Sequence, residues 1–551
     1  MEMNKKKIAI IGAGASGLTS CKSALENGLE PTVFERGSKV GGLWSEDKNI
    51  RKVWDDMQTN ISKYSVCFSD FPHYKSYSED EIFPNNKSVY KYFYDYCIEF
   101  DLLKHIKFNS SVTKITREYT NNNNNNSKSS NSNSNSNISN NEFKWKIIIN
   151  NKESEFELFD FLIVSTGVFS KPQEIPKILN DLKSFKGRIS YSQEYRNSEA
   201  FKDKKVVILG TSYSGCEIAA ELSNVTSSCI IVGQENKWVI KKFLPNNNGK
   251  LVPLDFLFFN RARCYEGLQL SIEQRWDRRN KAYSKLCPLQ DPKVTPNSKL
   301  PVKYNELSNS NKENIIKPVF AIISENYVDQ VEKGLIKAYS GNGFKIVESL
   351  LDGNSLKFQN DLGEIHIEEG IDEIILCNGY RLELDFLEQD ILQEINFLPS
   401  DSFQPLILYK NLFPPKTKNL AFISLYRGPF LTECELFSRW ATKVFSGKLN
   451  YPTNQDIEND LKIQLERRLE KPRPQFPILD FIHHCELIAK EIGCLPDFKE
   501  LEKSDKELYN ILWSDSFFCS ASYRLIGDGA KPEFAKSILL NYYENYKKLQ
   551  K

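Results

Sequence analysis

The sequence predicts an α/β fold built from two similar units, each a strand, a glycine-containing turn and a helix, followed by a mostly helical C-terminal segment. Three observations support this fold class. An apolar, strand-like run precedes the turn Gly12–Gly17, another precedes the turn Gly210–Gly215, and 551 residues are too many for one compact core. We therefore expect two to three domains.

The first unit has the features of a Rossmann-like dinucleotide-binding domain. The strand at 5–11 leads into a helix at 18–27, and Glu35 ends the next strand. The turn between the first strand and the helix is the run Gly12, Ala13, Gly14, Ala15, Ser16 and Gly17. Gly12 permits a tight turn, Gly14 lets the backbone approach a pyrophosphate, and Gly17 lets helix and strand pack closely. The helix N-terminus offers N–H groups to phosphates, and Glu35 can accept hydrogen bonds from ribose hydroxyls. We interpret this unit as a dinucleotide site rather than an ordinary glycine turn.

The second unit departs from this pattern. Its turn is the run Gly210, Thr211, Ser212, Tyr213, Ser214 and Gly215. Ser212 stands where the second glycine would be, so the backbone cannot approach a phosphate as closely, although the hydroxyl adds a donor. The strand that follows is succeeded by Glu235 and by no Arg. An Arg would favour the 2′-phosphate of NADP, so its absence weakens the case for NADP, although Lys237, Lys241 and Lys242 supply positive charge nearby. We interpret this unit as a second dinucleotide site, with an empty Rossmann fold as the alternative. Two such units suggest a flavin in the first and a nicotinamide in the second.

Composition excludes several classes of function. Lys and Arg number 73 against 72 Asp and Glu, so no global positive field recruits nucleic acid. The 12 Cys are scattered without CxxC spacing, and His483-His484 is interpreted as a solvated or capping pair, so no metal is expected. The sequence has no run of 18 consecutive apolar residues, so no transmembrane segment is predicted, and a cytoplasmic location is expected. The run Arg275–Arg279 is interpreted as a solvent-facing charge cluster rather than an anion site.

Further motifs lie between and after the two units. They are Gly41–Trp44, Thr59–Lys63, Phe68–Pro72, Phe161–Val168, Ile371–Tyr380, Leu408–Pro415, Glu435, Arg439-Trp440 and Ser522–Gly527. In this order and spacing the chain, from about Lys5 to about Leu540, resembles the flavin-containing monooxygenases, in the heteroatom-oxidising branch related to the Baeyer–Villiger monooxygenases. The family's FxGxxxHxxxY/F fingerprint is met by Phe185, Gly187 and Tyr195, but Tyr191 replaces the His. That replacement is either functional or a packing change.

The resemblance implies an enzyme like N,N-dimethylaniline monooxygenase. It would use FAD, NADP (NAD is the alternative) and O2 to form a C4a-hydroperoxyflavin that oxygenates a soft nitrogen or sulfur centre of a small-molecule amine or sulfur substrate. It implies Asn60 as the catalytic residue, since an amide donates and accepts without changing charge. It implies further cofactor contacts at Glu35, Gly42, Leu43, Trp44, Thr59, Asn60, Val112, Asn378 and Gly379. The alternatives are an NAD(P)H oxidase that releases hydrogen peroxide, motivated by Tyr191 and Ser212, and a degenerate flavoprotein binding module. The oligomeric state is left open.

The expected organisation is a discontinuous FAD domain at 1–176 and 343–453, a nicotinamide domain at 177–342 with an insert at about 251–307, and a helical segment at 454–551. Strands at 344–347, 364–367 and 371–376 are assigned to the FAD domain, and a helix is predicted at 478–492. The tract Asn121–Asn141 is almost entirely Asn and Ser, and strand-like sequence flanks it at 112–119 and 143–149. We interpret the tract as a disordered loop within a hairpin of the FAD domain.

Overall fold

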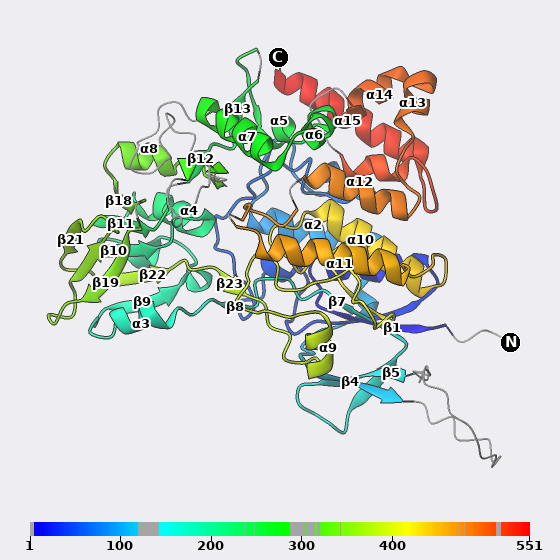
Figure 1. Cartoon of the computed structure of the whole chain (residues 1–551), viewed down its shortest axis with the longest axis horizontal. Coiled ribbons are helices and arrows are strands. Elements are labelled where there is room, and N and C mark those ends of the chain that lie inside the picture. Colours follow the sequence, from blue (N-terminus) through cyan, green and yellow to red (C-terminus); the bar gives the residue numbers. More distant parts are fainter. Residues whose placement is uncertain are drawn as a thin grey trace.

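The computed structural model describes residues 5–119, 143–286, 303–304, 315–316, 320–513 and 519–550, apart from residues 236, 247, 342, 472 and 479. The Asn/Ser tract lies outside the described residues, as does much of the predicted insert. The described chain forms two parallel sheets, each with its own glycine turn, and a C-terminal group of helices (Figure 1). The predicted fold class is confirmed.

The first sheet has five strands in the order β24-β7-β1-β2-β3. Their bounds are β1 Lys7–Ile11, β2 Glu30–Phe34, β3 Ile106–Lys107, β7 Phe161–Val164 and β24 Leu420–Phe422. β1 is parallel to β2 and β7, and β24 is parallel to β7. Helix α1 (Ala15–Glu26) packs beside α10 (Leu431–Phe445), where the Thr19 and Ser438 hydroxyls lie 2.8 Å apart. Because β24 and α10 come late in the chain, the first sheet and its helices are built from two separate stretches of sequence.

The second sheet has the order β18-β11-β10-β22-β9. Its bounds are β9 Arg188–Tyr191, β10 Lys205–Leu209, β11 Ser228–Gly233, β18 Ile336–Ser340 and β22 Glu373–Leu376, with helix α4 at Tyr213–Leu222 and helix α8 at Tyr327–Glu332. A small antiparallel sheet packs against it through Phe344, Leu356 and Phe358. The strands of this small sheet are β19 Lys345–Ser349, β20 Leu356–Gln359 and β21 Ile365–Glu368.

The expected return to the first domain near residue 343 is wrong. β22 pairs with β10 over Val206–Leu209, and β19 and β21 belong to the small sheet beside it, so residues 344–376 complete the second unit. A short antiparallel pair, β8 (Lys171–Pro172) and β23 (Tyr380–Arg381), joins the two halves of the chain where they cross between the domains. An apolar run such as Ile374–Leu376 identifies a buried strand, but it does not encode which of two parallel sheets the strand enters.

A hairpin extends the first domain. β4 (Val112–Tyr119) pairs antiparallel with β5 (Phe143–Ile149), which pairs with β6 (Phe156–Phe159). Ile115, Trp145 and Ile147 are fully buried in a core shared with the first sheet. The two predicted strands that flank the Asn/Ser tract therefore pair with one another.

The C-terminal segment is helical. It contains α11 Asn454–Leu469, α12 Phe481–Glu491, α13 Phe498–Ser504, α14 Lys506–Trp513 and α15 Pro532–Gln550. The helix predicted at 478–492 begins later, because Asp480 accepts from the His483 N–H (3.0 Å) and caps it. Three helices from within the second unit, α5 Leu254–Phe258, α6 Arg261–Leu268 and α7 Ile272–Leu286, precede this segment in sequence. The buried Arg261 guanidinium of α6 donates to Glu486 of α12 (2.6 Å), which ties this excursion to the C-terminal helices.

The remaining short elements are β12 Trp238–Ile240 with β17 Ala321–Ile323, β13 Phe243–Pro245 with β14 Leu251–Pro253, β15 Lys303–Tyr304 with β16 Ile315–Ile316, and the helices α2 Asn86–Glu99, α3 Pro176–Asp181 and α9 Gln389–Glu394. Among the described residues, no helix combines the length and apolar character that a membrane crossing requires.

Candidate functional site

The first glycine turn is built for a close backbone approach. Gly12 has φ +101°, and a Cβ on Gly17 would lie 1.8 Å from the Gly12 carbonyl oxygen, so only glycine fits at Gly17. Gly14 is the N-cap of α1 and places no side chain over the helix terminus. A Cβ on Gly42 would lie 2.9 Å from the Gly14 Cα, so the two backbones are in contact there. The free N–H groups at the start of α1 suit the diphosphate of a dinucleotide.

Glu35 fastens this turn to the end of β2. Its carboxylate is buried, with one oxygen accepting from the Ala13 N–H (2.8 Å) and the other from the Gly37 N–H (2.8 Å). Each carboxylate oxygen can accept a further hydrogen bond, so Glu35 can also receive ribose hydroxyls. The geometry fits the dinucleotide predicted for the first unit.

The residues after the first unit approach the same edge of the sheet. Gly41 donates its N–H to the Ala13 carbonyl (3.0 Å), and Gly42–Trp44 forms a short 3-10 turn. Thr59 is buried and donates its hydroxyl to the Ile61 carbonyl (2.8 Å). Val112 instead begins the hairpin strand β4 and packs against the core shared with the first sheet.

A cavity of about 1540 Å³ lies between the two domains. Of the predicted site residues, it is lined by Leu43, Trp44, Thr59, Asn60, Gly210, Thr211, Ser212, Tyr213, Ser214, Asn378 and Gly379. Its described lining does not include the first turn, Glu35, Gly42, Val112 or Gly215. The cavity therefore joins the second turn to the segments that follow the first unit.

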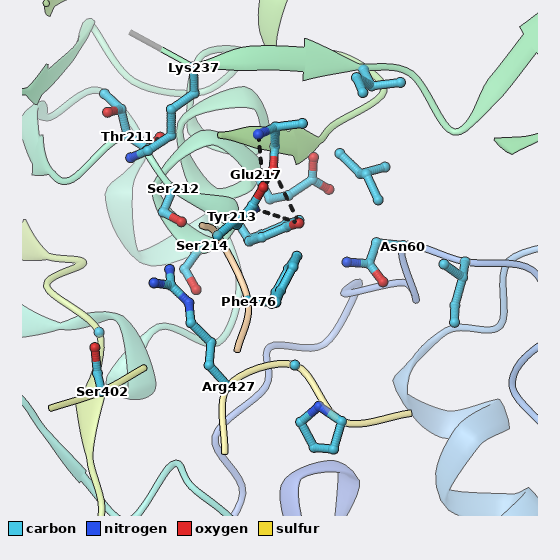
Figure 2. A pocket seen from close by; sticks show the side chains of 18 of the residues that line it. Asn60, Thr211, Ser212, Tyr213, Ser214, Glu217, Lys237, Ser402, Arg427 and Phe476 are labelled. Carbon is cyan, nitrogen blue, oxygen red and sulfur yellow. Dashed lines mark hydrogen bonds between the residues drawn. The ribbon is translucent and has the colours of Figure 1, made fainter. Parts of the chain in front are cut away.

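The second turn repeats the backbone geometry of the first. Gly210 has φ +113°, and a Cβ on Gly215 would lie 1.8 Å from the Gly210 carbonyl oxygen. Ser212 is the N-cap of α4, and its side chain makes no capping hydrogen bond. The Tyr213 hydroxyl donates to the Ala321 carbonyl (3.3 Å), so its ring is held against β17. Figure 2 shows the side chains of Ser212, Tyr213 and Ser214 together at this wall.

Asn60 lies across the cavity from the second turn (Figure 2). Its residue is exposed to the cavity, and among the described residues its amide makes no side-chain hydrogen bond. A structural Asn in a loop or cap bonds its own backbone, whereas this amide is available to a ligand.

The comparison with protein families identifies the family to which the chain belongs. The model of flavin-binding monooxygenase-like proteins matches residues 5–276 and 350–551. The chain belongs to this family. Human flavin-containing monooxygenase 2 is 28% identical, with 95% of this chain and 89% of the relative aligned, and rat flavin-containing monooxygenase 5 is 27% identical over 98% and 92%.

Solved structures show the same fold. An S-allyl-L-cysteine S-oxygenase from Allium sativum has a TM-score of 0.57 at 19% identity, covering 99% of this chain and 100% of its own. A cyclohexanone monooxygenase from Rhodococcus sp. Phi1 bound to NADP+ has a TM-score of 0.58 at 13% identity, covering 89% and 98%. The S-oxygenase and the cyclohexanone monooxygenase thus share the fold of this chain.

Three residues of the monooxygenase cavity, Arg427, Gln475 and Phe476, are not predicted from the sequence, and a fourth, Lys237, is predicted only in part. Arg427 and Lys237 bring positive charge to the second turn, and Gln475 and Phe476 cross the cavity from the C-terminal segment. Gln475 pairs with both backbone groups of Ala321, accepting from its N–H (3.0 Å) and donating to its carbonyl (2.6 Å). Lys237 was noted only as nearby charge, and the other three lie in no local motif.

Tyr191 and the paired histidines have structural roles. Tyr191 packs partly against the core of the second sheet and does not line the described cavity, which favours the packing explanation for the missing His. The interpretation of His484 as solvated is wrong: its side chain is only 14% exposed, with Nε2 3.7 Å from the buried Glu433 carboxylate, and burial lowers its pKa to about 3. No group of three metal-ligating side chains occurs among the described residues.

The Arg275–Arg279 run is divided between solvent and cavity. Arg278 is exposed and pairs with Glu266 (3.0 Å), as a solvent-facing cluster predicts. Arg275 is half-buried and donates to the backbone carbonyls of Leu268 and Leu270, both at 3.1 Å. Arg275, Arg278 and Arg279 are all among the described lining of the cavity.

Proposed function

We propose that this monooxygenase binds FAD at the first turn and NADPH at the second, and uses O2 to oxygenate a soft nitrogen or sulfur centre of a small molecule. One observation carries the proposal: a single cavity connects the second turn with Leu43, Trp44 and Asn60, which follow the first unit. A nicotinamide that enters from the second turn would meet a flavin ring there.

Bound FAD, once reduced by the nicotinamide, supplies the activation of O2. The chain supplies enclosure and orientation. Phe258, Phe259, Phe430 and Phe481 line one end of the cavity, and such apolar walls exclude water that would divert reduced oxygen to peroxide. The Asn60 amide lines the cavity and would orient cofactor and oxygen by donating and accepting hydrogen bonds.

The proposal requires no protein nucleophile, because the substrate is the nucleophile. Two cysteines lie in the cavity wall, Cys264 and Cys377. Burial raises the pKa of Cys377 to about 12 and that of Cys264 further, so both thiols stay protonated and unreactive at neutral pH.

Two classes of substrate are supported by the names of similar proteins. Several relatives are named dimethylaniline monooxygenases that form N-oxides, and one structural neighbour is named an S-oxygenase of S-allyl-L-cysteine. Tertiary amines and thioethers are therefore the first compounds to test.

The test is rapid mixing of the FAD-loaded protein with NADPH and, in parallel, with NADH, followed by O2 with a thioether or a tertiary amine. We expect reduction of the flavin and formation of sulfoxide or N-oxide in step with nicotinamide consumption. Hydrogen peroxide equal to the nicotinamide consumed, with every trial substrate, would instead establish the oxidase. A protein that takes up no FAD would establish the binding module.

A further inference from the structure

Arg427 enters the cavity from an unexpected part of the chain. It lies in the loop after β24, a strand of the first sheet, yet it lines the cavity together with the second turn. In Figure 2 its side chain extends toward Ser214 and the start of α4. Two effects agree with this closeness: the Arg427 charge acts on the Tyr213 hydroxyl and on the Lys237 ammonium.

The loop that carries Arg427 is held in place. Gly428 has φ +82°, and a Cβ there would lie 2.5 Å from the Phe476 ring, so the loop and the Gln475–Phe476 segment are in close contact. Gln475 is in turn fixed to Ala321 of β17 by two hydrogen bonds of 3.0 and 2.6 Å. The guanidinium is thus presented from a supported position.

The charge of Arg427 is not neutralised by the described protein. Its guanidinium makes no hydrogen bond or ion pair there, although burial disfavours its charged form and lowers its pKa. The acids in the described lining of the cavity have other neighbours. Asp480 accepts from Cys264 and from the His483 N–H, and the buried Glu433 lies beside His484. Asp181 lies 3.9 Å from Lys177, Glu217 interacts with Ser324, and Glu235 acts on Lys237. A partly buried cation without a counter-charge favours an anionic ligand.

The second turn offers a second positive source at the same place. α4 begins at Tyr213 with no side-chain cap, so its first N–H groups and the positive end of its dipole face the ligand space. Lys237, half-buried, donates to the Thr211 carbonyl (3.3 Å) within the turn. A planar guanidinium facing a helix N-terminus matches a phosphate, which can accept two parallel hydrogen bonds from Arg.

We propose that Arg427 binds the diphosphate of the nicotinamide dinucleotide, so that the cofactor of the second turn is held from the first domain as well. The inference rests on the proposed function, because it assumes that a nicotinamide dinucleotide binds at the second turn. Arg427 is then a positioning residue for the second turn, although it lies about 200 residues further along the chain. It supplies positive charge to a turn in which Ser212 replaces a glycine.

The test measures binding rather than turnover. NADP+, NAD+ and inorganic pyrophosphate are titrated calorimetrically into the FAD-loaded protein and into Arg427→Gln, Arg427→Lys and the matched control Arg188→Gln. Arg188 is exposed at the start of β9 and is not in the described lining of the cavity. We expect Arg427→Gln to weaken the binding of NADP+ and of NAD+ by a similar factor of about 10 to 100, since both dinucleotides carry the diphosphate. Arg427→Lys should recover part of the loss, pyrophosphate should bind less tightly to Arg427→Gln than to the parent, and Arg188→Gln should bind all three ligands like the parent.

The outcomes separate this inference from the proposed function. If the parent protein binds neither dinucleotide, the proposed function fails. If the parent binds and Arg427→Gln binds equally well, the inference alone is overturned. A loss confined to NADP+ would place the 2′-phosphate at Arg427 and overturn the diphosphate assignment. Flavin content and unfolding temperature of Arg427→Gln must equal those of Arg188→Gln, which removes misfolding as a cause.

Discussion

The two glycine turns have the same backbone and different surroundings. In both, a Cβ on the last glycine would lie 1.8 Å from the carbonyl oxygen of the first. The first turn is tied on several sides, by the Ala13 N–H to Glu35 and by the Gly41 N–H to the Ala13 carbonyl. The second opens into the large cavity, where Arg427 and Lys237 stand nearby. We therefore expect the first turn to hold a cofactor that is retained and the second turn to hold one that exchanges.

The largest effect on cofactor binding is expected when one methyl group is added to the last glycine of each turn. Gly17→Ala and Gly215→Ala place a Cβ against a backbone carbonyl that cannot move aside, and each should strain its turn by about 3 kcal/mol. We expect Gly17→Ala to lose bound FAD, and Gly215→Ala to keep FAD but bind nicotinamide at least about tenfold more weakly. Flavin absorbance after purification and NADP+ titration measure the two effects.

Gly28→Ala is the matched control for these variants. Gly28 also has a positive φ, +76°, but a Cβ there meets nothing within 4 Å. It should cost only about 1 kcal/mol and leave both cofactors bound. Loss of FAD in Gly215→Ala, or its retention in Gly17→Ala, would contradict the assignment of one cofactor to each turn.

Asn60 tests what happens where the two sites meet. Asn60→Ala should retain FAD and nicotinamide, because neither turn is altered, but product formation should fall on the order of 100-fold as one positioned amide is lost. Hydrogen peroxide release should rise in step. Peroxide and oxygenated product are measured per nicotinamide consumed.

The control is Asn197→Ala, whose amide donates to Asp55 (3.2 Å) and which is not among the described lining of the cavity. Its coupling should equal that of the parent protein. Unchanged coupling in Asn60→Ala would remove Asn60 from the mechanism.

The comparison also shows what local sequence encodes. The first turn and Glu35 are adjacent in the first unit, and hydrogen bonds from nearby backbone complete their geometry, so the motif predicted their arrangement. Arg427 and Gln475 come from segments more than 200 residues after the second turn and carry no motif, so only the fold brings them there. The predicted domain boundary at residue 343 is wrong for a related reason. The four residues of β22 are all buried and would suit either parallel sheet, so their sequence does not encode that β22 pairs with β10. Val112 rests on the resemblance alone: it begins β4 and, like Glu35, is not in the described lining of the cavity, so its contact with a cofactor stays a prediction.

A smaller difference between the units lies on their helices. Glu221 of α4 faces Tyr195 and the Trp54 region of the first domain, and burial, with the nearby Asp56 and Glu217 charges, raises its pKa to about 7. Its unfolded pKa is about 4.3, so the folded protein holds the proton more tightly between these values. Stability should therefore fall as pH rises from about 4.5 to 7, by about 1–2 kcal/mol after allowance for solvent screening.

Glu221→Gln should flatten this part of the stability profile and make the protein more stable than the parent above pH 7. Chemical unfolding at a series of pH values measures it. Glu332→Gln, at an exposed position on α8, should leave the slope as it is. If the free energy of unfolding changes between pH 4.5 and 7 by the same amount in the parent and in Glu221→Gln, Glu221 does not contribute to the pH dependence.

The smallest effect is expected from replacing Asn121–Asn141 with a short glycine-containing turn. The flanking strands pair up to Tyr119 and Phe143, whose rings lie 5.7 Å apart, so a short turn can join them without moving either strand. Shortening a loop of this length should stabilise the protein by roughly 1 kcal/mol, and both turns should keep their ligands. Flavin content, NADP+ affinity and unfolding temperature are measured beside Trp145→Ala, which empties the buried core of the same hairpin and should cost about 3–5 kcal/mol. Colourless or insoluble protein after the replacement would show that the first turn depends on the tract, and the two units would then differ in more than their surroundings.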